Sequence, residues 1–114
     1  MASILLSEAD PHLRKLLVGF LERLGHDAIV RGGVSKVTPP ADLLLLEPSS
    51  AACLEQAQLA RRFQPALPVV CMSCLPEDAS FLALGPLTYL QKPFGLRELA
   101  DAIELGLAGD RGAA

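Results

Sequence analysis

The sequence predicts a single α/β domain built around a parallel β-sheet. Short, fully apolar runs alternate with longer segments in which apolar residues recur every three or four positions, and this alternation is typical of strands and amphipathic helices in turn. The length of 114 residues leaves room for one hydrophobic core. Nine glycines and nine prolines supply the short connections that such a chain needs.

The composition excludes several classes of function. With 51% hydrophobic and 20% charged residues, the chain is too apolar to be disordered. The net charge is −3 and no stretch concentrates Lys or Arg, so we expect no binding of nucleic acid by this domain. The start lacks the basic and apolar regions of a signal peptide, and no apolar run nears the roughly 20 residues that span a bilayer. We therefore expect a cytoplasmic domain without membrane contact.

The N-terminal third holds the clearest strand and helix. Residues 3–7 predict a buried strand, Asp10 is the predicted N-cap of a helix, and Gly25 ends that helix. Residues 26–30 predict a weaker strand. Two glycines and two prolines in residues 31–40 leave a helix there short or missing. The expected buried face of the first helix consists of Leu13, Leu16, Leu17, Phe20, Leu21 and Leu24.

The rest of the chain repeats the alternation of strand and helix. We expect strands at 43–46, 69–72 and 87–91, and helices at 51–63, 77–84 and 96–107. The expected inward residues of the 51–63 helix are Leu54, Ala57 and Ala60, with Leu59 and Phe63 fitting less regularly. Those of the last helix are Leu96, Leu99, Ile103 and Leu107. The domain is predicted to cover residues 1–108, with 109–114 as a tail or linker.

Polar residues follow several of the predicted strands. In a parallel sheet the carboxyl ends of the strands share one edge, and sites form there, where the strand order reverses. We therefore expect a functional site at this edge. The residues that converge there are Ser7, Glu8, Ala9 and Asp10, then Glu47, Pro48 and Ser49, then Ser73 and Cys74, and last Lys92 and Pro93.

Three segments in this order resemble the receiver domain of two-component response regulators: ILLSEADPHLR (4–14), DLLLLE (42–47) and YLQKPF (89–94). The resemblance covers nearly the whole chain. It implies a flavodoxin-like three-layer sandwich with a five-stranded parallel sheet. In that family an aspartate after the third strand accepts a phosphoryl group. Mg²⁺ is held there by acids after the first strand and by the backbone carbonyl two residues past the acceptor, which here is that of Ser49.

The chain departs from the family where phosphate and metal are bound. Glu47 stands at the acceptor position, and its extra methylene moves the carboxylate by about 1.5 Å in a site where about 1 Å matters. Ala9, beside Glu8, stands where the principal metal-binding aspartate would be, and alanine has no oxygen to offer. We therefore expect a degenerate pocket that uses no metal or other cofactor.

The residues that transmit the signal in the family are retained. Ser73 matches the hydroxyl that binds the phosphoryl group, Tyr89 matches the aromatic that moves with it, and Lys92 matches the lysine that pairs with the site. The resemblance thus implies a phosphorylation-independent signalling domain that is not an enzyme, with a fixed ion pair between Glu47 and Lys92. We expect it to bind a protein partner, such as an output domain, through residues 77–108, and a homodimer is possible.

Other interpretations remain open. Exposed apolar area is expected at Leu105, Ala102 and Gly106, which lie off the inward stripe of the last helix. The domain could be a phosphorylatable receiver with an unusual acceptor, or the pair of Glu47 and Lys92 could be structural only. Glu8 and Asp10 suit the first turn of a helix by electrostatics alone. The Cys71/Cys74 motif could indicate a thiol redox protein, although three cysteines in a cytosolic chain are by default reduced.

Overall fold

The computed structural model describes residues 2–30, 40–73 and 88–112. Its elements, in chain order, are β1 (Ser3–Ser7), α1 (Pro11–Arg23), β2 (Asp27–Val30), β3 (Leu43–Leu46), α2 (Ala51–Phe63), β4 (Val69–Ser73), β5 (Thr88–Gln91) and α4 (Leu96–Gly112). The predicted strands and these three helices are confirmed to within a few residues at their ends. The helix expected at 77–84 and the segment 31–39, where a helix was expected to be short or missing, lie outside the described residues.

The five strands form one sheet in the order β2-β1-β3-β4-β5, and every neighbouring pair is parallel. This is the flavodoxin-like order, so the predicted fold is confirmed. The strand order reverses between β1 and β3, where Ser7 lies opposite Leu46. The residues that follow these two strands, Glu8 and Glu47, are therefore held side by side at the carboxyl edge.

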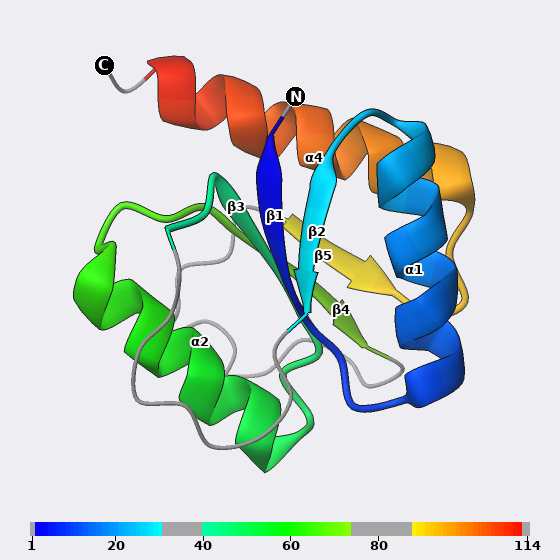
Figure 1. Cartoon of the computed structure of the whole chain (residues 1–114), viewed down its shortest axis with the longest axis horizontal. Helices are drawn as coiled ribbons and strands as arrows, with labels where there is room; N and C mark the ends of the chain where they lie inside the picture. The colour runs from blue at the N-terminus through cyan, green and yellow to red at the C-terminus, as the bar shows by residue number, and fades with distance from the viewer. Residues whose placement is uncertain (1, 31–39, 74–87, 113–114) are drawn as a thin grey trace.

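Helices cover both faces of the sheet, with α1 and α4 on one side and α2 on the other (Figure 1). Alternate strand residues point to opposite faces, so Ile4 and Leu6 pack with α1 and α4, whereas Leu5 packs with α2. The strands β1, β3 and β4 are almost entirely buried, as expected for central strands of a parallel sheet.

The ends of α1 follow the sequence signals. The Asp10 carboxylate accepts hydrogen bonds from the backbone N–H groups of His12 (2.9 Å) and Leu13 (3.4 Å), and Pro11 begins the helix. Gly25, just after the C-cap Leu24, has a φ of 87°. Glycine adopts this left-handed conformation at little cost, which explains why it follows the helix.

Several residues predicted to face the core are exposed instead. In α1, Leu17 and Leu21 are buried, whereas Leu16 is 63% exposed and Leu24 41%. In α2, Phe63 is 56% exposed. A helix turns about 100° per residue, so apolar residues beside the central stripe cannot all reach the sheet. The apolar pattern of these helices is wider than the face that the sheet covers.

The helix α4 also corrects the prediction. Leu96 is 48% exposed, and Ala102 and Gly106 are buried, whereas Leu105 is exposed as expected. The helix continues to Gly112, past residue 108, where the domain was predicted to end. No proline interrupts the chain there, and the glycines weaken the helix without ending it. No helix among the described residues combines the length and hydropathy that a membrane crossing requires.

Candidate functional site

Three charged side chains meet at the carboxyl edge of the sheet. Glu8 follows β1, Glu47 follows β3 and Lys92 follows β5. The ladder hydrogen bonds continue past the strands and fix these positions: the Glu47 N–H donates to the Ser7 carbonyl (2.9 Å), and the Lys92 N–H donates to the Ser73 carbonyl (2.7 Å). Both carboxylates are largely buried, with residue exposures of 4% for Glu8 and 7% for Glu47.

The Lys92 ammonium joins the two carboxylates. Its Nζ lies 2.6 Å from Glu8 Oε1 and 2.8 Å from Glu47 Oε1. The predicted ion pair between Glu47 and Lys92 is therefore present, and Glu8 is a second partner. Two negative charges and one positive charge leave this acid–lysine pocket, formed by Glu8, Glu47 and Lys92, with a net charge of −1.

The remaining carboxylate oxygens also have donors. Oε2 of Glu8 accepts from the Asp10 N–H (3.1 Å). Oε2 of Glu47 accepts both from the Ser49 N–H (3.1 Å) and from the Ser49 hydroxyl (2.9 Å). Every oxygen of the two carboxylates is thus hydrogen-bonded. Among the described residues, no buried side-chain nitrogen or oxygen lacks a partner, as native packing requires.

The hydrogen bonds outweigh the effect of burial on the charges. Burial raises the pKa of Glu47, but the hydrogen bonds from Lys92 and Ser49 lower it by more than burial raises it. The pKa of Glu47 is therefore below its ordinary value. Burial lowers the pKa of Lys92, but its bonds to Glu47 and Glu8 raise it above the ordinary value. Glu47 and Lys92 therefore both stay charged at neutral pH.

The other predicted site residues differ in burial and in what they contact. Ser73 is fully buried at the end of β4. Tyr89 is half-buried, lies opposite Cys71 in the sheet and packs against the core cluster on the α2 side. Ala9 is exposed and has no polar side-chain atom. Ser49 contributes both its N–H and its hydroxyl, whereas the resemblance assigned a role only to its carbonyl.

The role of Glu8 is what sequence reasoning missed. The sequence placed Glu8 in the degenerate pocket without a partner there, and it left open that Glu8 and Asp10 serve only the electrostatics of the helix start. In the structure only Asp10 caps α1. Glu8 is instead buried against Lys92. A signal was available, because Glu8 directly follows a fully apolar strand at the edge where Lys92 was expected. An acid in that position needs a buried cation as partner.

The described residues give no support to metal or thiol chemistry. No group of three or more His, Cys, Asp or Glu side chains in residues 2–30, 40–73 and 88–108 is placed to hold a metal ion. Cys53 and Cys71 are both buried, whereas a reactive thiol needs some exposure. Cys74, the second half of the predicted redox motif, lies outside the described residues.

Comparison with known proteins identifies the fold. No protein-family model matches the sequence, and no curated protein matches it. The structure resembles a CheY-like receiver domain protein from Methanospirillum hungatei JF-1, with a TM-score of 0.86 and 17% identity over 100% of this chain and 99% of the other. It also resembles the receiver domain of a sensor histidine kinase from Pseudomonas aeruginosa PAO1, solved with a magnesium ion in its active site cleft. That match has a TM-score of 0.78 and 20% identity over 94% and 98%.

A third match is part of a larger protein. NtrX from Brucella abortus, solved in complex with ADP, has a TM-score of 0.80 and 21% identity over 96% of this chain, which spans only 27% of the NtrX chain. At these identities the likeness establishes the fold and nothing finer. The chain has the fold of a response regulator receiver domain.

Proposed function

We propose that this chain is a receiver-like signalling domain that works without phosphorylation, as a protein-interaction module. The observation that carries the proposal is the position of Lys92, whose ammonium bridges Glu8 and Glu47. Receiver domains as a class are signalling modules whose partners are output domains or kinases. In this chain we therefore expect the general signalling role of the fold, with a pocket that is not phosphorylated.

The residues present do not fit Mg²⁺. This ion requires about six oxygen ligands in octahedral geometry, but Ala9 supplies none at the position where the family has its principal metal-binding aspartate. Glu8 and Glu47 each give one oxygen to the ammonium. A divalent cation between them would meet the positive charge of Lys92. The Lys92 ammonium already supplies a positive charge between the two carboxylates.

Phosphoryl transfer is also poorly supported. A carboxylate that attacks phosphorus needs an available oxygen, but Lys92 and Ser49 engage both oxygens of Glu47. The net charge of −1 repels a phosphoryl dianion when no metal offsets it. A phosphorylated glutamate would also extend beyond the position that an aspartate occupies. These three features favour a pocket that does not accept a phosphoryl group.

A fixed pocket leaves protein binding as the means of signalling. Glu47 provides permanently one of the roughly two negative charges that phosphorylation would add. Ser73, Tyr89 and Lys92 are then held in one arrangement. Within the region expected to bind a partner, 77–108, the described part exposes Leu105 and Leu96, and exposed apolar area is typical of interfaces. The partner would be an output domain, another signalling protein or a second copy.

Incubation with acetyl phosphate and Mg²⁺ tests the proposal. We expect the intact mass and the backbone amide spectrum of the chain to stay unchanged, while a phosphorylatable receiver domain in the same mixture gains one phosphoryl group. The double variant Ala9→Asp/Glu47→Asp serves as the matched control, because it restores a metal ligand and the usual acceptor. An adduct on the unmodified chain at Glu47 would establish the alternative, a phosphorylatable receiver with an unusual acceptor.

A further inference from the structure

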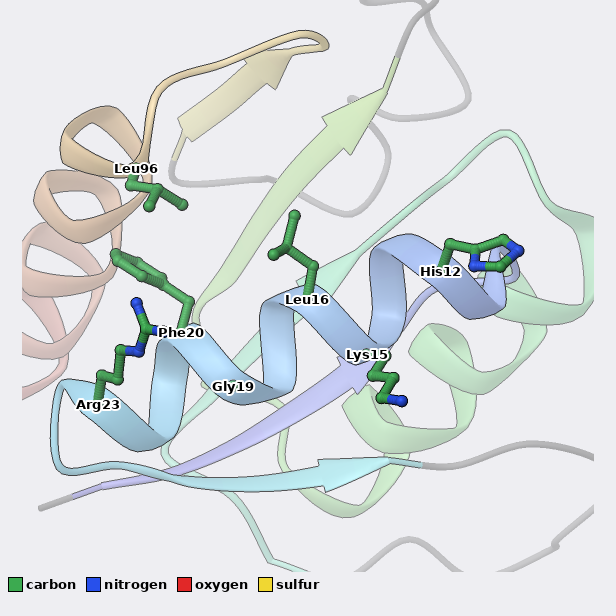
Figure 2. A pocket seen from close by; sticks show the side chains of 7 residues that line it. All are labelled: His12, Lys15, Leu16, Gly19, Phe20, Arg23 and Leu96. Carbon is green, nitrogen blue, oxygen red and sulfur yellow. The ribbon is translucent and has the colours of Figure 1, made fainter.

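A groove of about 410 Å³ lies along α1, next to the first residue of α4 (Figure 2). This α1 groove shares no residue with the acid–lysine pocket. Its apolar floor consists of Leu16, Gly19 and Phe20 from α1 and Leu96 from α4, and Lys15 and Arg23 add positive charge to the lining. A cleft of roughly 300–1,000 Å³ with an apolar lining and a few polar groups is typical of sites for small molecules.

Three large apolar side chains of the groove are incompletely covered by the described part of the domain. Leu16 is 63% exposed and Leu96 48%, and Phe20 is half-buried. Leu16 and Phe20 are four residues apart, so they are neighbours on the helix surface. Both project to the side on which Leu96 lies (Figure 2). An apolar body placed among these three side chains would remove apolar surface from water, which is favourable.

Gly19 leaves a bare stretch of helix backbone in the floor of the groove. A glycine inside a helix weakens the helix relative to alanine, so its presence calls for a reason. A Cβ atom built on Gly19 would meet nothing within 4 Å, and Gly19 has no positive φ. No described part of the chain therefore requires glycine here. A ligand that lies directly on the backbone would require it, and a planar aromatic ring has a suitable shape.

Arg23 places a positive charge one helical turn beyond Gly19. The two residues are four positions apart, which is about 6 Å along the helix axis at 1.5 Å per residue. Arg23 lies at the same end of the groove as Phe20 and Leu96 (Figure 2). No described acid forms an ion pair with Arg23 or with Lys15. The guanidinium group of arginine matches the geometry of a carboxylate and also stacks on aromatic faces, so it suits a ligand that carries both groups.

We propose that the α1 groove is a binding site for small aromatic carboxylates, with the ring on Gly19 between Leu16 and Leu96 and the carboxylate on Arg23. The ring accounts for the glycine and for the exposed apolar side chains. The carboxylate accounts for the arginine that no described acid pairs with. The proposal goes beyond the function proposed above and does not depend on it, because no groove residue belongs to the acid–lysine pocket. Binding here would give the domain an input other than phosphorylation.

Shape and charge favour this class of ligand over three other occupants. A straight-chain acid would meet the same cation but has no flat face to lie on Gly19. A neutral aromatic molecule would cover the apolar floor but would leave Arg23 without an anion. A second copy of the chain, docked through this face about a two-fold axis, would bring the cations of both copies together, and like charges in an interface are unfavourable.

Titration of the full chain with naphthoate, followed by backbone amide spectra, tests the proposal. We expect a dissociation constant of about 1 mM or tighter, which a ligand of this size can reach. The amide shifts should centre on Gly19, Arg23 and Leu96. Neutral naphthylmethanol should bind roughly threefold more weakly, the value of an exposed ion pair, and straight-chain decanoate should also bind more weakly than naphthoate. High salt should weaken the binding of naphthoate and leave that of naphthylmethanol unchanged, because salt screens exposed charges.

Variants of the groove, with matched variants on α2, test the assignment of the site. Arg23→Gln should lower the affinity for naphthoate to that for naphthylmethanol, and Leu16→Ser should weaken the binding of both molecules. Arg62→Gln changes an exposed cation and Phe63→Ser a side chain of similar exposure, 56%, both on the other side of the sheet. Neither control should alter binding. Thermal melts establish that each variant is folded.

Several results would overturn the proposal. They are the absence of amide shifts in α1 at millimolar naphthoate, decanoate binding as tight as that of naphthoate, an unchanged affinity in Arg23→Gln, and an effect of Phe63→Ser as large as that of Leu16→Ser. A dimer that Leu16→Ser dissociates would assign the groove to a second copy and would also overturn it. Each of these would leave the acetyl phosphate result unchanged, so the two proposals can fail separately.

Discussion

The acid–lysine pocket and the α1 groove use their polar and apolar groups in opposite ways. In the pocket, each oxygen of Glu8 and Glu47 accepts a hydrogen bond from the chain itself. In the groove, Leu16 and Leu96 face solvent, and Lys15 has no ion-pair partner among the described residues. The polar groups of the first region are paired within the domain, whereas the second region leaves apolar and charged side chains exposed.

The difference indicates where this fold can meet other molecules. A buried pocket whose groups all have partners gains little from a ligand, because each new contact must replace an existing one. An exposed apolar groove with unpaired charges gains from every contact. Under the function that we propose, the edge of the sheet that usually binds ligands is a structural element, and the candidate binding surface lies elsewhere on the domain.

Removing the cation of the pocket should have the largest effect. Lys92→Met leaves Glu8 and Glu47 buried side by side, and breaking a buried pair in this way costs about 3–5 kcal/mol. We expect that loss in the free energy of unfolding, measured by urea denaturation at neutral pH. Acidification should restore part of the stability, because protonation of one carboxyl removes the repulsion.

The exposed Lys15 provides the control for Lys92. Lys15→Met removes the same charge from α1, where a surface substitution changes stability by less than about 0.5 kcal/mol. If Lys92→Met cost no more than Lys15→Met, the pocket would not be held together by its ion pairs. The contrast between a closed pocket and an open groove would then be wrong.

Removing one acid should cost less than removing the cation. Glu47→Gln leaves Lys92 paired with Glu8, so we expect a loss of about 0.5–1.5 kcal/mol, the net value of a hydrogen bond. The sequence predicted Glu47 as the partner of Lys92 and gave no second one. Combining Glu47→Gln with Glu8→Gln should exceed the sum of the single losses by about 0.5–3 kcal/mol. Strictly additive losses would mean that the two acids act separately.

The pH dependence of the Glu47 contribution has a defined sign. Because the pKa of Glu47 is lowered from 4.5 in the folded state, its contribution is full above pH 4.5 and is lost as the pH falls through the folded value. The pKa of Lys92 is raised from 10.5, so its contribution is full below pH 10.5 and is lost as the pH rises through the folded value. The stability difference between the unmodified chain and Glu47→Gln should therefore be constant near neutral pH and shrink in acid.

Much of the fold could be predicted from the sequence because its signals are local. The four leucines of β3, the Asp10 cap and Gly25 each specify their own element, and alternation of strand and helix specifies the parallel sheet. The burial of residues beside the central apolar stripe of a helix could not be predicted in this way. Whether Leu16 or Leu96 is covered depends on how two distant helices approach each other, and the periodicity of either helix alone does not contain that information.

The pocket illustrates the same limit. The edge of the sheet was predictable, and so was the pair of Glu47 and Lys92, because each residue directly follows a recognisable strand. The different roles of Glu8 and Asp10 could not be predicted, because either acid is a typical residue at the start of a helix. Only the three-dimensional position of Lys92, 2.6 Å from Glu8, separates the capping acid from the paired one.

The smallest expected effect concerns the centre of the groove. Gly19→Ala adds a Cβ that meets nothing within 4 Å, so the free domain should become more stable by about 0.5–1 kcal/mol, the usual gain of alanine over glycine inside a helix. The same methyl group should hinder an aromatic ring seated on Gly19 and weaken binding of naphthoate. Gly25→Ala is the matched control: its Cβ also meets nothing within 4 Å, but its φ of 87° makes alanine cost about 1–2 kcal/mol. Denaturation together with naphthoate titration of both variants separates the two effects. A Gly19→Ala domain that is more stable and binds naphthoate unchanged would show that no ring lies on α1 at this residue.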